Sequence, residues 1–179
     1  DTPTPAGYEN YILAEALLDL IVGDYELLEK YVGKDLEYTE YEPLFDYATV
    51  DKKAFYVTCD NYVTLTDGTG AVHIAPAFGE DDSRIGRNYD LPFVQLVDGK
   101  GEFKAEARDV AGMFCKDADE PIMKLLYEKG LLFKVLKFEH SYPFCWRCDT
   151  PLIYYARESW FIKMTAAKSD MIDNNNTIN

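Results

Sequence analysis

The residues best suited to chemistry lie in one short stretch between Gly68 and Asp82. Glycines at 68 and 70 let the backbone approach a ligand closely, because no Cβ stands in the way. His73, one of only 2 histidines, lies on a short apolar segment within the stretch. Three acidic residues, 80–82, follow at the expected start of a helix, where unpaired amides stabilise negative charge. The stretch predicts a ligand site, although helix stabilisation alone also accounts for the acidic residues.

A second candidate site is the pair Cys145 and Cys148, which are separated by two residues. This spacing turns two thiolates to one side of a tight loop and supplies half of a tetrahedral zinc site. His140 is near enough in the sequence to be a third ligand. Incidental thiols are the main alternative, and a redox pair would need a thioredoxin-like βαβ setting that the pattern lacks.

Composition and charge exclude several classes of partner. With 47% hydrophobic and 28% charged residues, the 179-residue chain is typical of a globular protein. It has neither an apolar run of membrane-spanning length nor a signal-peptide pattern, so we expect a cytoplasmic protein with no membrane partner. The net charge of −14 disfavours free-standing nucleic-acid binding, because it repels phosphates. A pocket that receives only the end of an RNA remains compatible with this charge.

The elements that must position these residues are a few helices and many short extended segments. Helical patterns are expected at 11–22, 24–31, 80–88, 120–129 and 166–172. Asp119 is the expected cap of the strongest helix, and Gly130 its end. Both ends of the chain look cut, without an initiator Met or a closing element, so we expect a piece of a longer protein.

Short strands are expected to outnumber the helices. The patterns point to strands at 55–58, 62–66, 71–75, 93–97, 131–138 and 152–155, with turns at Asp67-Gly68 and Asp98-Gly99. Because helices do not alternate regularly with strands, the predicted fold class is α+β, with a β-barrel-like core and peripheral helices. We expect one main domain over residues 8–138 and a smaller returning segment over 139–179.

Two long strings carry a family resemblance. The string GTGAVHIAPAFGEDD, from Gly68 to Asp82, resembles the signature loop of the editing domain inserted in isoleucyl-tRNA synthetases. The string HSYPFCWRCDTPL, from His140 to Leu152 and running on to residues 158–163, is similar to the family's exit from that insertion. Valyl and leucyl relatives share the GTGAV frame, whereas Val-His-x-Ala-Pro points to the isoleucyl branch. The resemblance covers residues 50–179 well and implies the editing-domain fold of the class Ia Val, Ile and Leu synthetases.

The resemblance implies a hydrolase that removes valine from the 3′-terminal adenosine of the isoleucine tRNA. Asp82, nine residues after His73, matches the carboxylate that holds the α-ammonium group, a role suited to a charge-assisted hydrogen bond. His73 matches the residue that helps exclude the larger isoleucyl group, and Asp81 is the nearest competitor of Asp82. Asp82 and His73 are therefore the expected catalytic residues. Substrate binding is expected at Gly68, Thr69, Gly70, Ala71, Phe78, Gly79 and Asp81.

Energetics explain why such a site is needed. One methylene in an apolar pocket is worth about 1–3 kcal/mol, and the isoleucyl enzyme is itself a standard example of this limit. A second, smaller pocket then admits valyl and rejects isoleucyl groups. The chain has no evident Ser-His-Asp set and no obvious general base. We therefore expect hydrolysis that depends on orientation, with Asp82 anchoring the substrate and a positioned water attacking the ester.

One part of the family's pocket is absent from the sequence. The family uses a Thr-rich peptide of the type Thr-Thr-Thr-Pro-Trp-Thr upstream of the GTG loop, and no such string is present here. We therefore expect one wall of the pocket to be missing and isolated activity to be weak. The alternative function is a non-catalytic module that docks the tRNA 3′ end, or a zinc-ribbon interaction module.

The resemblance also implies cofactors and partners. Editing requires no cofactor, zinc belongs to the parent protein through Cys145 and Cys148, and a partner pair of cysteines outside this chain completes the site. ATP belongs only to the parent's catalytic domain, which joins isoleucine to tRNA, because the HIGH and KMSKS motifs are not in this chain. The expected partners are the 3′ end of tRNA(Ile) and that catalytic domain, against which Trp146 and Trp160 are expected to pack.

Overall fold

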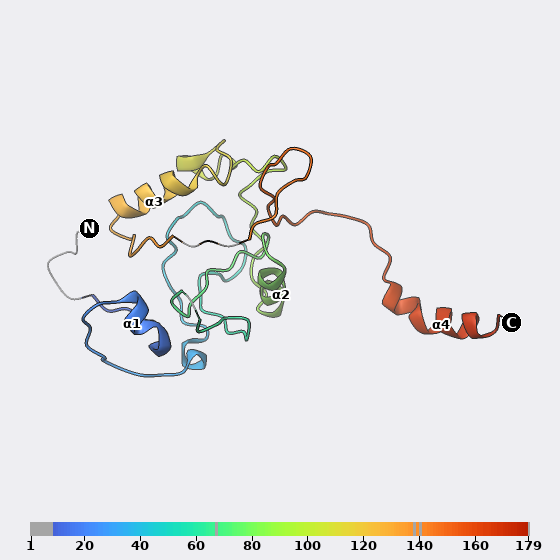
Figure 1. Cartoon of the computed structure of the whole chain (residues 1–179), viewed down its shortest axis with the longest axis horizontal. Coiled ribbons are helices and arrows are strands. Elements are labelled where there is room, and N and C mark those ends of the chain that lie inside the picture. Colours follow the sequence, from blue (N-terminus) through green and yellow to red (C-terminus); the bar gives the residue numbers. More distant parts are fainter. Residues whose placement is uncertain (1–8, 67, 138, 140, 179) are drawn as a thin grey trace.

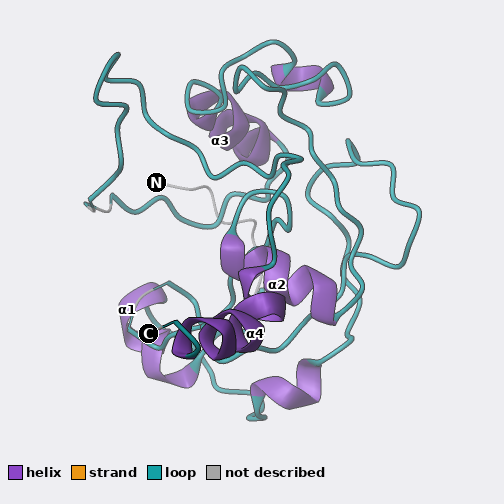
Figure 2. Ribbon diagram, turned by 90° about the vertical axis from the view of Figure 1, so that its right-hand side faces the viewer, coloured by secondary structure: helices purple, strands orange, loops and turns teal. Residues whose placement is uncertain are grey.

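A computed structural model describes residues 9–66, 68–137, 139 and 141–178 (Figure 1). Its regular elements are helices joined by long loops, and Figure 2 shows no strand among the described residues. The 3₁₀ helices are η1 (Glu15–Leu17), η2 (Gly33–Leu36) and η3 (Arg108–Val110). The α-helices are α1 (Leu18–Ile21), α2 (Glu80–Asn88), α3 (Asp119–Glu128) and α4 (Met164–Asn176).

Helix α2 forms where the sequence predicts it and supports the loop before it. Gly79 is its N-cap in an extended conformation. The side chain of Ile85, which is 1% exposed, packs the helix against the interior. Gly86 lies so close to Pro76 that a Cβ there would stand 2.8 Å from the proline Cβ. The loop of residues 74–79 therefore packs directly on α2, which fixes the loop's position relative to the acidic first turn.

Helix α3 ends as predicted but begins differently. Gly130 adopts a φ of +69°, and the amides of Gly130 and Leu131 donate to the carbonyls of Tyr127 and Leu126 at 3.0 and 2.8 Å. This is the Schellman arrangement, in which a left-handed glycine satisfies the last carbonyls of the helix. The expected cap at Asp119 is wrong: Asp119 is the first helical residue, and Ala118 precedes it without a capping side chain.

The N-terminal helices are shorter than predicted. Of the expected helix over 11–22 only η1 and α1 form, and they bury Leu17 and Ile21. The helix expected over 24–31 is absent from the structure, and Leu27 and Leu28 remain exposed at 50% and 69%. A short helix is not stable alone, because nucleation is unfavourable and most of its stability comes from packing of an apolar face.

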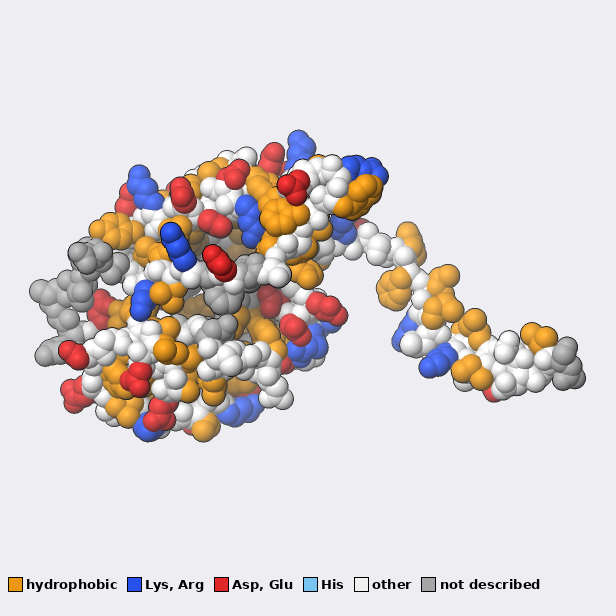
Figure 3. Space-filling model, in the orientation of Figure 1, with side chains coloured by type: hydrophobic (Ala, Val, Ile, Leu, Met, Phe, Trp, Pro, Cys, Tyr) orange, Lys and Arg blue, Asp and Glu red, His pale blue; other side chains and the backbone are white. Residues whose placement is uncertain are grey.

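Helix α4 forms at the predicted place and is longer than expected. Figure 1 shows that it extends away from the rest of the molecule at the end of an extended segment. No residue of α4 is buried, and the segment before it exposes Trp160, Phe161 and Ile162 at 103%, 81% and 82%. In Figure 3 hydrophobic side chains are visible along the arm that leads to the C-terminus.

The prediction of a β-barrel-like core is not met in the described residues, where the six expected strands remain irregular. The extended segments pair only at isolated bridges, Glu40 with Tyr56, Val97 with Phe103, Glu102 with Phe114, and Phe144 with Pro151. Phe55 has a φ of +57° and Tyr38 one of +66°, and such left-handed residues interrupt a ladder. Pairing therefore extends only from Tyr38–Val57 to Tyr41–Phe55, through amide bonds of 2.8 and 2.9 Å.

The turn predicted at Asp98-Gly99 is present. The Asp98 amide donates to the Glu102 carbonyl at 2.8 Å, and Gly101 adopts a φ of +85°. The Asp98 carboxylate accepts the amides of Lys100 and Glu102 at 2.8 and 3.0 Å, and these backbone bonds lower the Asp98 pKa. The turn at Asp67 lies outside the described residues.

The hydrophobic core is small for the size of the chain. One cluster joins Ala107, Val110 and Ala118, against which partly buried side chains such as Phe103 and Ile122 pack. The accessible surface is 14848 Å², whereas a compact monomer of 20.5 kDa exposes about 8,900 Å² by the usual scaling with mass. Much apolar surface is thus uncovered. In the described part of the chain, no helix is long and apolar enough to span a membrane.

Candidate functional site

The Gly-rich turn packs against the N-terminal segment of the chain. The Thr69 hydroxyl lies 3.1 Å from the Ala71 carbonyl and 3.3 Å from its amide, and the Ala14 amide donates to the Thr69 carbonyl at 2.9 Å. Gly70, at a φ of +79°, lies so close to Ala14 that a Cβ would stand 2.4 Å from the alanine Cβ. In this structure the close approach that Gly70 permits is therefore to the chain itself, while Gly68 faces open space.

His73 lies on the extended segment between this turn and Pro76. It is exposed, as are Ala71 and Val72. Within the described residues, no hydrogen bond or ion pair joins the His73 ring to another side chain. The ring is thus available to contact a ligand, and Ile74 and Ala75, which follow it, are partly buried.

Asp82 turns back over the N-terminus of α2. Its Oδ2 accepts a hydrogen bond of 2.9 Å from the Ala75 amide. The carboxylate lies against Gly79, where a Cβ would come within 3.0 Å of Asp82 Cγ and 3.1 Å of Oδ2. The absence of a side chain at Gly79 therefore makes room for this conformation, which joins Asp82 to the loop that carries His73.

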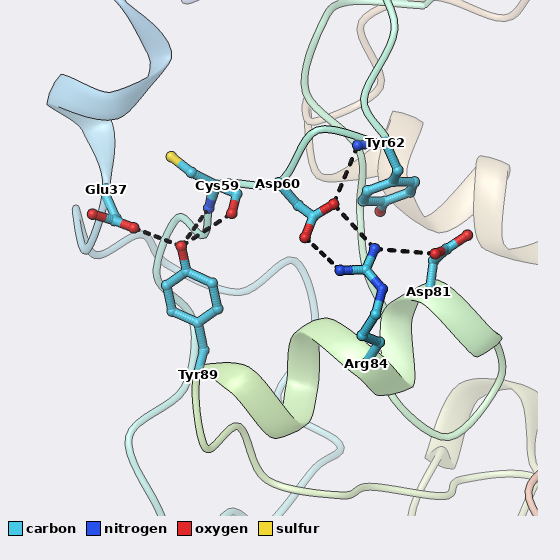
Figure 4. A network of polar contacts seen from close by, with 7 residues as sticks. All are labelled: Glu37, Cys59, Asp60, Tyr62, Asp81, Arg84 and Tyr89. Atoms are coloured by element: carbon cyan, nitrogen blue, oxygen red, sulfur yellow. Dashed lines mark hydrogen bonds and ion pairs between the residues drawn. The ribbon is translucent and has the colours of Figure 1, made fainter.

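Asp81, the neighbouring residue, is held in a different way. Arg84 binds Asp60 through two hydrogen bonds of 2.7 and 3.0 Å and reaches Asp81 at 3.1 Å (Figure 4). The bidentate arginine holds the pKa of Asp60 below its usual range, and the two carboxylates raise the pKa of Arg84. Asp81 thus shares a cation, whereas in the described residues no ion pair holds Asp82.

The other end of α2 is anchored by Tyr89. Its hydroxyl donates to Glu37 at 2.5 Å, lies 3.1 Å from the Cys59 carbonyl, and accepts the Cys59 amide at 3.0 Å (Figure 4). The hydrogen bond to the Glu37 carboxylate is the main cause that raises the Tyr89 pKa. Helix α2 is therefore tied at both ends to the segment of residues 59–62, and this holds the acidic turn in place.

The returning segment contacts the same loop. The Ala156 amide donates to the Ala77 carbonyl at 3.0 Å, and the rings of Phe78 and Tyr155 meet edge to face at 6.1 Å. The Tyr155 hydroxyl donates to the Val97 carbonyl at 3.3 Å. Phe78, a predicted substrate-binding residue, is therefore partly covered by residues 155–156.

Cys145 and Cys148 lie on a tight loop of the expected form. The Cys145 amide donates to the Thr150 carbonyl at 2.9 Å, and Asp149, at a φ of +56°, donates to the Cys145 carbonyl at 2.8 Å. Cys148 Sγ lies 3.2 Å from the Thr150 hydroxyl. The Thr150 bonds, followed by the Cys145 thiol, lower the Cys148 pKa, which favours the thiolate that binds metals.

The described residues contain no group of three or more His, Cys, Asp or Glu side chains that could hold a metal ion. His140, the candidate third ligand, lies outside the described residues. The two thiols therefore fit zinc in type and spacing but provide only half of a structural site.

Comparison with curated proteins extends over almost the whole chain. It is 52% identical over 170 residues to the isoleucine–tRNA ligase of Clostridium acetobutylicum, which is 95% of this chain. It is 44% identical over 169 residues to that of Bacillus thuringiensis and 41% identical over 173 residues to that of Picrophilus torridus. The chain belongs to the isoleucine–tRNA ligase family.

The match covers a limited part of each isoleucine–tRNA ligase. The chain spans 16% of the Clostridium acetobutylicum protein and 17% of the Picrophilus torridus protein. No protein-family model matches the chain. The family resemblance of the sequence is thus confirmed, and the chain corresponds to one segment of these much longer enzymes.

Several residues of this synthetase segment were not predicted from the sequence. Asp60, Tyr62 and Arg84 surround the acidic turn, and Tyr155 covers Phe78. A partial signal was available for Arg84, since it stands three residues after Asp81, where helical side chains meet. For Asp60, Tyr62 and Tyr155 no local pattern indicates the contact.

Proposed function

We propose that this chain acts as the editing region of an isoleucine–tRNA ligase and hydrolyses the ester that joins valine to the 3′ end of tRNA(Ile). Asp82 would bind the α-ammonium group of the misattached amino acid, and His73 would line the pocket for its side chain. The backbone of Gly68, Thr69, Gly70 and Ala71, with Phe78 and Gly79, would surround the terminal adenosine. The family membership and the contacts of Asp82 support this assignment.

The observation that carries the proposal is the conformation of Asp82. Its carboxylate is partly buried, turned toward the loop of residues 73–79 by the Ala75 amide, and free of any ion pair within the described residues. A carboxylate that is fixed in direction but keeps its charge can bind an ammonium group with a charge-assisted hydrogen bond.

The difference between Asp81 and Asp82 supports the choice of Asp82. Asp81 is exposed and shares Arg84 with Asp60, so an incoming ammonium group would compete with a guanidinium. Asp82 has no such competitor and is next to Gly79, a predicted pocket residue. Asp81 then belongs to the support of α2 and not to the pocket.

The proposed reaction is the addition of water to the ester carbonyl carbon. A C–O bond forms from the water oxygen, and the bond from that carbon to the ribose oxygen breaks. One water proton ends on the ribose hydroxyl, and the released amino acid ionises. Neither an oxidant nor a cofactor is required. The contribution of the protein is orientation of the substrate, which can supply a large part of the rate.

The experiment is to map binding of a non-hydrolysable valyl-adenosine analogue by NMR, with the isoleucyl analogue as the control. The expected result is that the valyl analogue shifts the signals of His73, Gly79 and Asp82, and that Asp82→Asn abolishes these shifts while Asp81→Asn retains them. Deacylation of valyl-tRNA(Ile), measured with the Thr-Thr-Thr-Pro-Trp-Thr peptide restored, then separates hydrolysis from docking of the tRNA end. Normal deacylation by the Asp82→Asn variant would contradict the proposed role of Asp82 in binding the substrate.

We further propose that the rest of a synthetase covers the exposed apolar surface of this chain. The exposed side chains include Trp146 at 86% and Trp160 at 103%, and the accessible surface of 14848 Å² is far above that of a compact monomer. In the complete protein the extended segments would form part of a β-rich editing domain, as the antiparallel pairing of 38–41 with 55–57 suggests. The complete protein would join isoleucine to tRNA, with ATP bound only in its catalytic domain.

We also propose that Cys145 and Cys148 provide two of the four thiolates of a structural zinc site in the complete protein. The loop geometry and the lowered Cys148 pKa support this assignment. Zinc content of the full-length protein, measured by mass spectrometry, should be one ion and should be lost in Cys148→Ser. An unchanged zinc content in that variant would exclude the pair as ligands.

A further inference from the structure

The hydroxyl of Tyr62 is a buried polar group that has no role in the proposed reaction. Its hydroxyl oxygen is fully buried and has no hydrogen-bond partner of ordinary geometry in the described residues. Buried hydroxyls in native structures are nearly always paired, because an unpaired one has lost water without replacing it. A free donor at this position therefore requires an explanation.

The surroundings of the hydroxyl are acidic. Burial is the main cause that raises the Tyr62 pKa, and the negative charges of Asp82, Asp81 and Asp60 follow in that order. Asp82 is thus the carboxylate that affects the phenol most, through its charge and as an acceptor within reach of the hydroxyl, although no hydrogen bond of ordinary geometry joins the two. Because burial and negative charge both keep the phenol protonated, the Tyr62 hydroxyl has a hydrogen that it can donate.

The position of Tyr62 is fixed relative to the helix that carries Asp82. The Tyr62 amide donates to Asp60 Oδ1 at 3.2 Å, and Asp60 is bound by both guanidinium nitrogens of Arg84 on α2. Figure 4 shows the Tyr62 ring beside the first turn of α2, with Asp60 and Arg84 between its backbone and the helix. The Asp60–Arg84 pair therefore holds the phenol next to the acidic turn.

We propose that Tyr62 is a positioning residue for Asp82, whose carboxylate accepts the phenol hydrogen when it binds the ammonium group of the substrate. In the structure the Ala75 amide donates a hydrogen bond to Asp82 Oδ2, and the unpaired Tyr62 hydroxyl is the second donor nearby. Two neutral donors fix the direction of the carboxylate without removing its charge, so the charge remains available for the ammonium group. This inference rests on the proposed function and adds a residue to the site.

The first test measures the coupling without changing Tyr62. In protein labelled with ¹³C at the tyrosine Cζ, the Tyr62 signal is followed against pH in the wild type, Asp82→Asn and Asp81→Asn. Asp82→Asn is expected to lower the Tyr62 pKa more than Asp81→Asn does, since the Asp82 charge has the larger effect. Equal titration curves in the wild type and Asp82→Asn would overturn the inference.

The second test is Tyr62→Phe, which keeps the ring and removes the hydroxyl. We expect binding of the valyl-adenosine analogue to weaken about tenfold, the usual effect of losing one hydrogen bond to a charged group. The matched control is Tyr56→Phe, because the Tyr56 hydroxyl donates to the Tyr89 carbonyl at 2.8 Å, at the far end of α2. This control should leave the affinity within about twofold.

The outcomes separate this inference from the proposed function. If Tyr62→Phe binds like the wild type while Asp82→Asn does not bind, the role of Tyr62 is wrong and the editing function stands. If Asp82→Asn also binds normally, the proposed function itself fails. If neither analogue binds this chain, or Tyr62→Phe does not fold, the Cζ titration of the wild type against Asp82→Asn decides.

Discussion

The carboxylate of Asp82 accepts a hydrogen bond of 2.9 Å from the amide of Ala75, seven residues earlier in the chain. This contact joins the first turn of α2 to the loop that follows His73. A side chain at position 79 would crowd this arrangement, because its Cβ would stand 3.0 Å from Asp82 Cγ and 3.1 Å from Oδ2. The predicted catalytic aspartate is therefore positioned by backbone atoms, and this makes its arrangement open to test.

Gly79→Ala should displace Asp82 from the Ala75 amide. The new Cβ would stand 3.0 Å from Asp82 Cγ, closer than ordinary contact. We expect a large shift of the Ala75 amide signal in ¹H–¹⁵N NMR and about tenfold weaker binding of the valyl-adenosine analogue. The control is Gly99→Ala, where a Cβ meets nothing within 4 Å. An unchanged Ala75 signal in Gly79→Ala would contradict the described contact.

Arg84→Gln should lower the free energy of unfolding at neutral pH, where Asp60 is charged, and should have little effect in strong acid. Arg84 lowers the Asp60 pKa in the folded state, so the pair stabilises the fold above the unfolded-state pKa of Asp60. That contribution is lost as the pH falls through the lower, folded-state pKa. Urea unfolding of wild type and Arg84→Gln should therefore differ at pH 7 and converge in strong acid. A difference that stays constant down to pH 2 would argue against the ion pair.

Gly70→Ala should destabilise the contact between the Gly-rich turn and the N-terminal segment. It adds a clash with Ala14 to the cost of a left-handed alanine, which is about 1–2 kcal/mol. Gly68→Ala, with a φ of +68° and open space around it, should incur only the latter cost. Hydrogen exchange of the Ala14 amide, which binds the Thr69 carbonyl, should accelerate in Gly70→Ala only. The double variant Ala14→Gly/Gly70→Ala should regain the part of the stability that the clash with the Ala14 side chain removes.

Cys148 should be the more reactive thiol when compared with Cys115. The Thr150 hydroxyl and amide lower the Cys148 pKa, whereas burial raises that of Cys115. Below its ordinary pKa, Cys148 therefore has the larger thiolate fraction, and the thiolate is the nucleophile. Alkylation by iodoacetamide near neutral pH, followed by peptide mass spectrometry, should modify Cys148 first. Thr150→Val should slow that modification, and equal rates for both cysteines would refute the assignment.

Trp160→Ala should leave the stability of this chain unchanged within about 0.5 kcal/mol, because the side chain is 103% exposed. Leu17→Ala, at a position with 1% exposure, should cost about 2–5 kcal/mol. Denaturant unfolding of the two variants measures both values. In the full-length synthetase, Trp160→Ala should become destabilising if the rest of the protein covers this residue.

Local sequence signals were sufficient to predict the helices whose ends are marked by residues close in the sequence. Helix α2 begins after Gly79, and α3 ends shortly before Gly130, because a glycine and a run of helical residues act within a few positions. The two long strings also determined the family, since a motif with its spacing identifies a relative without any knowledge of packing. The α4 helix was also predicted at the correct place, from its run of helical residues alone.

Strand formation and the difference between the two aspartates depended on tertiary contacts. A strand requires a partner along its length, and the left-handed Tyr38 and Phe55 limit the pairing of Glu40 with Tyr56 to a single bridge. Asp81 and Asp82 are identical in type and adjacent in sequence. Only the folded chain brings Asp60 and Arg84 to the first and the Ala75 amide to the second. The sequence alone determined the family and the motif, whereas tertiary structure decided which of the two carboxylates forms an ion pair within the described residues, because that depends on residues distant in the chain.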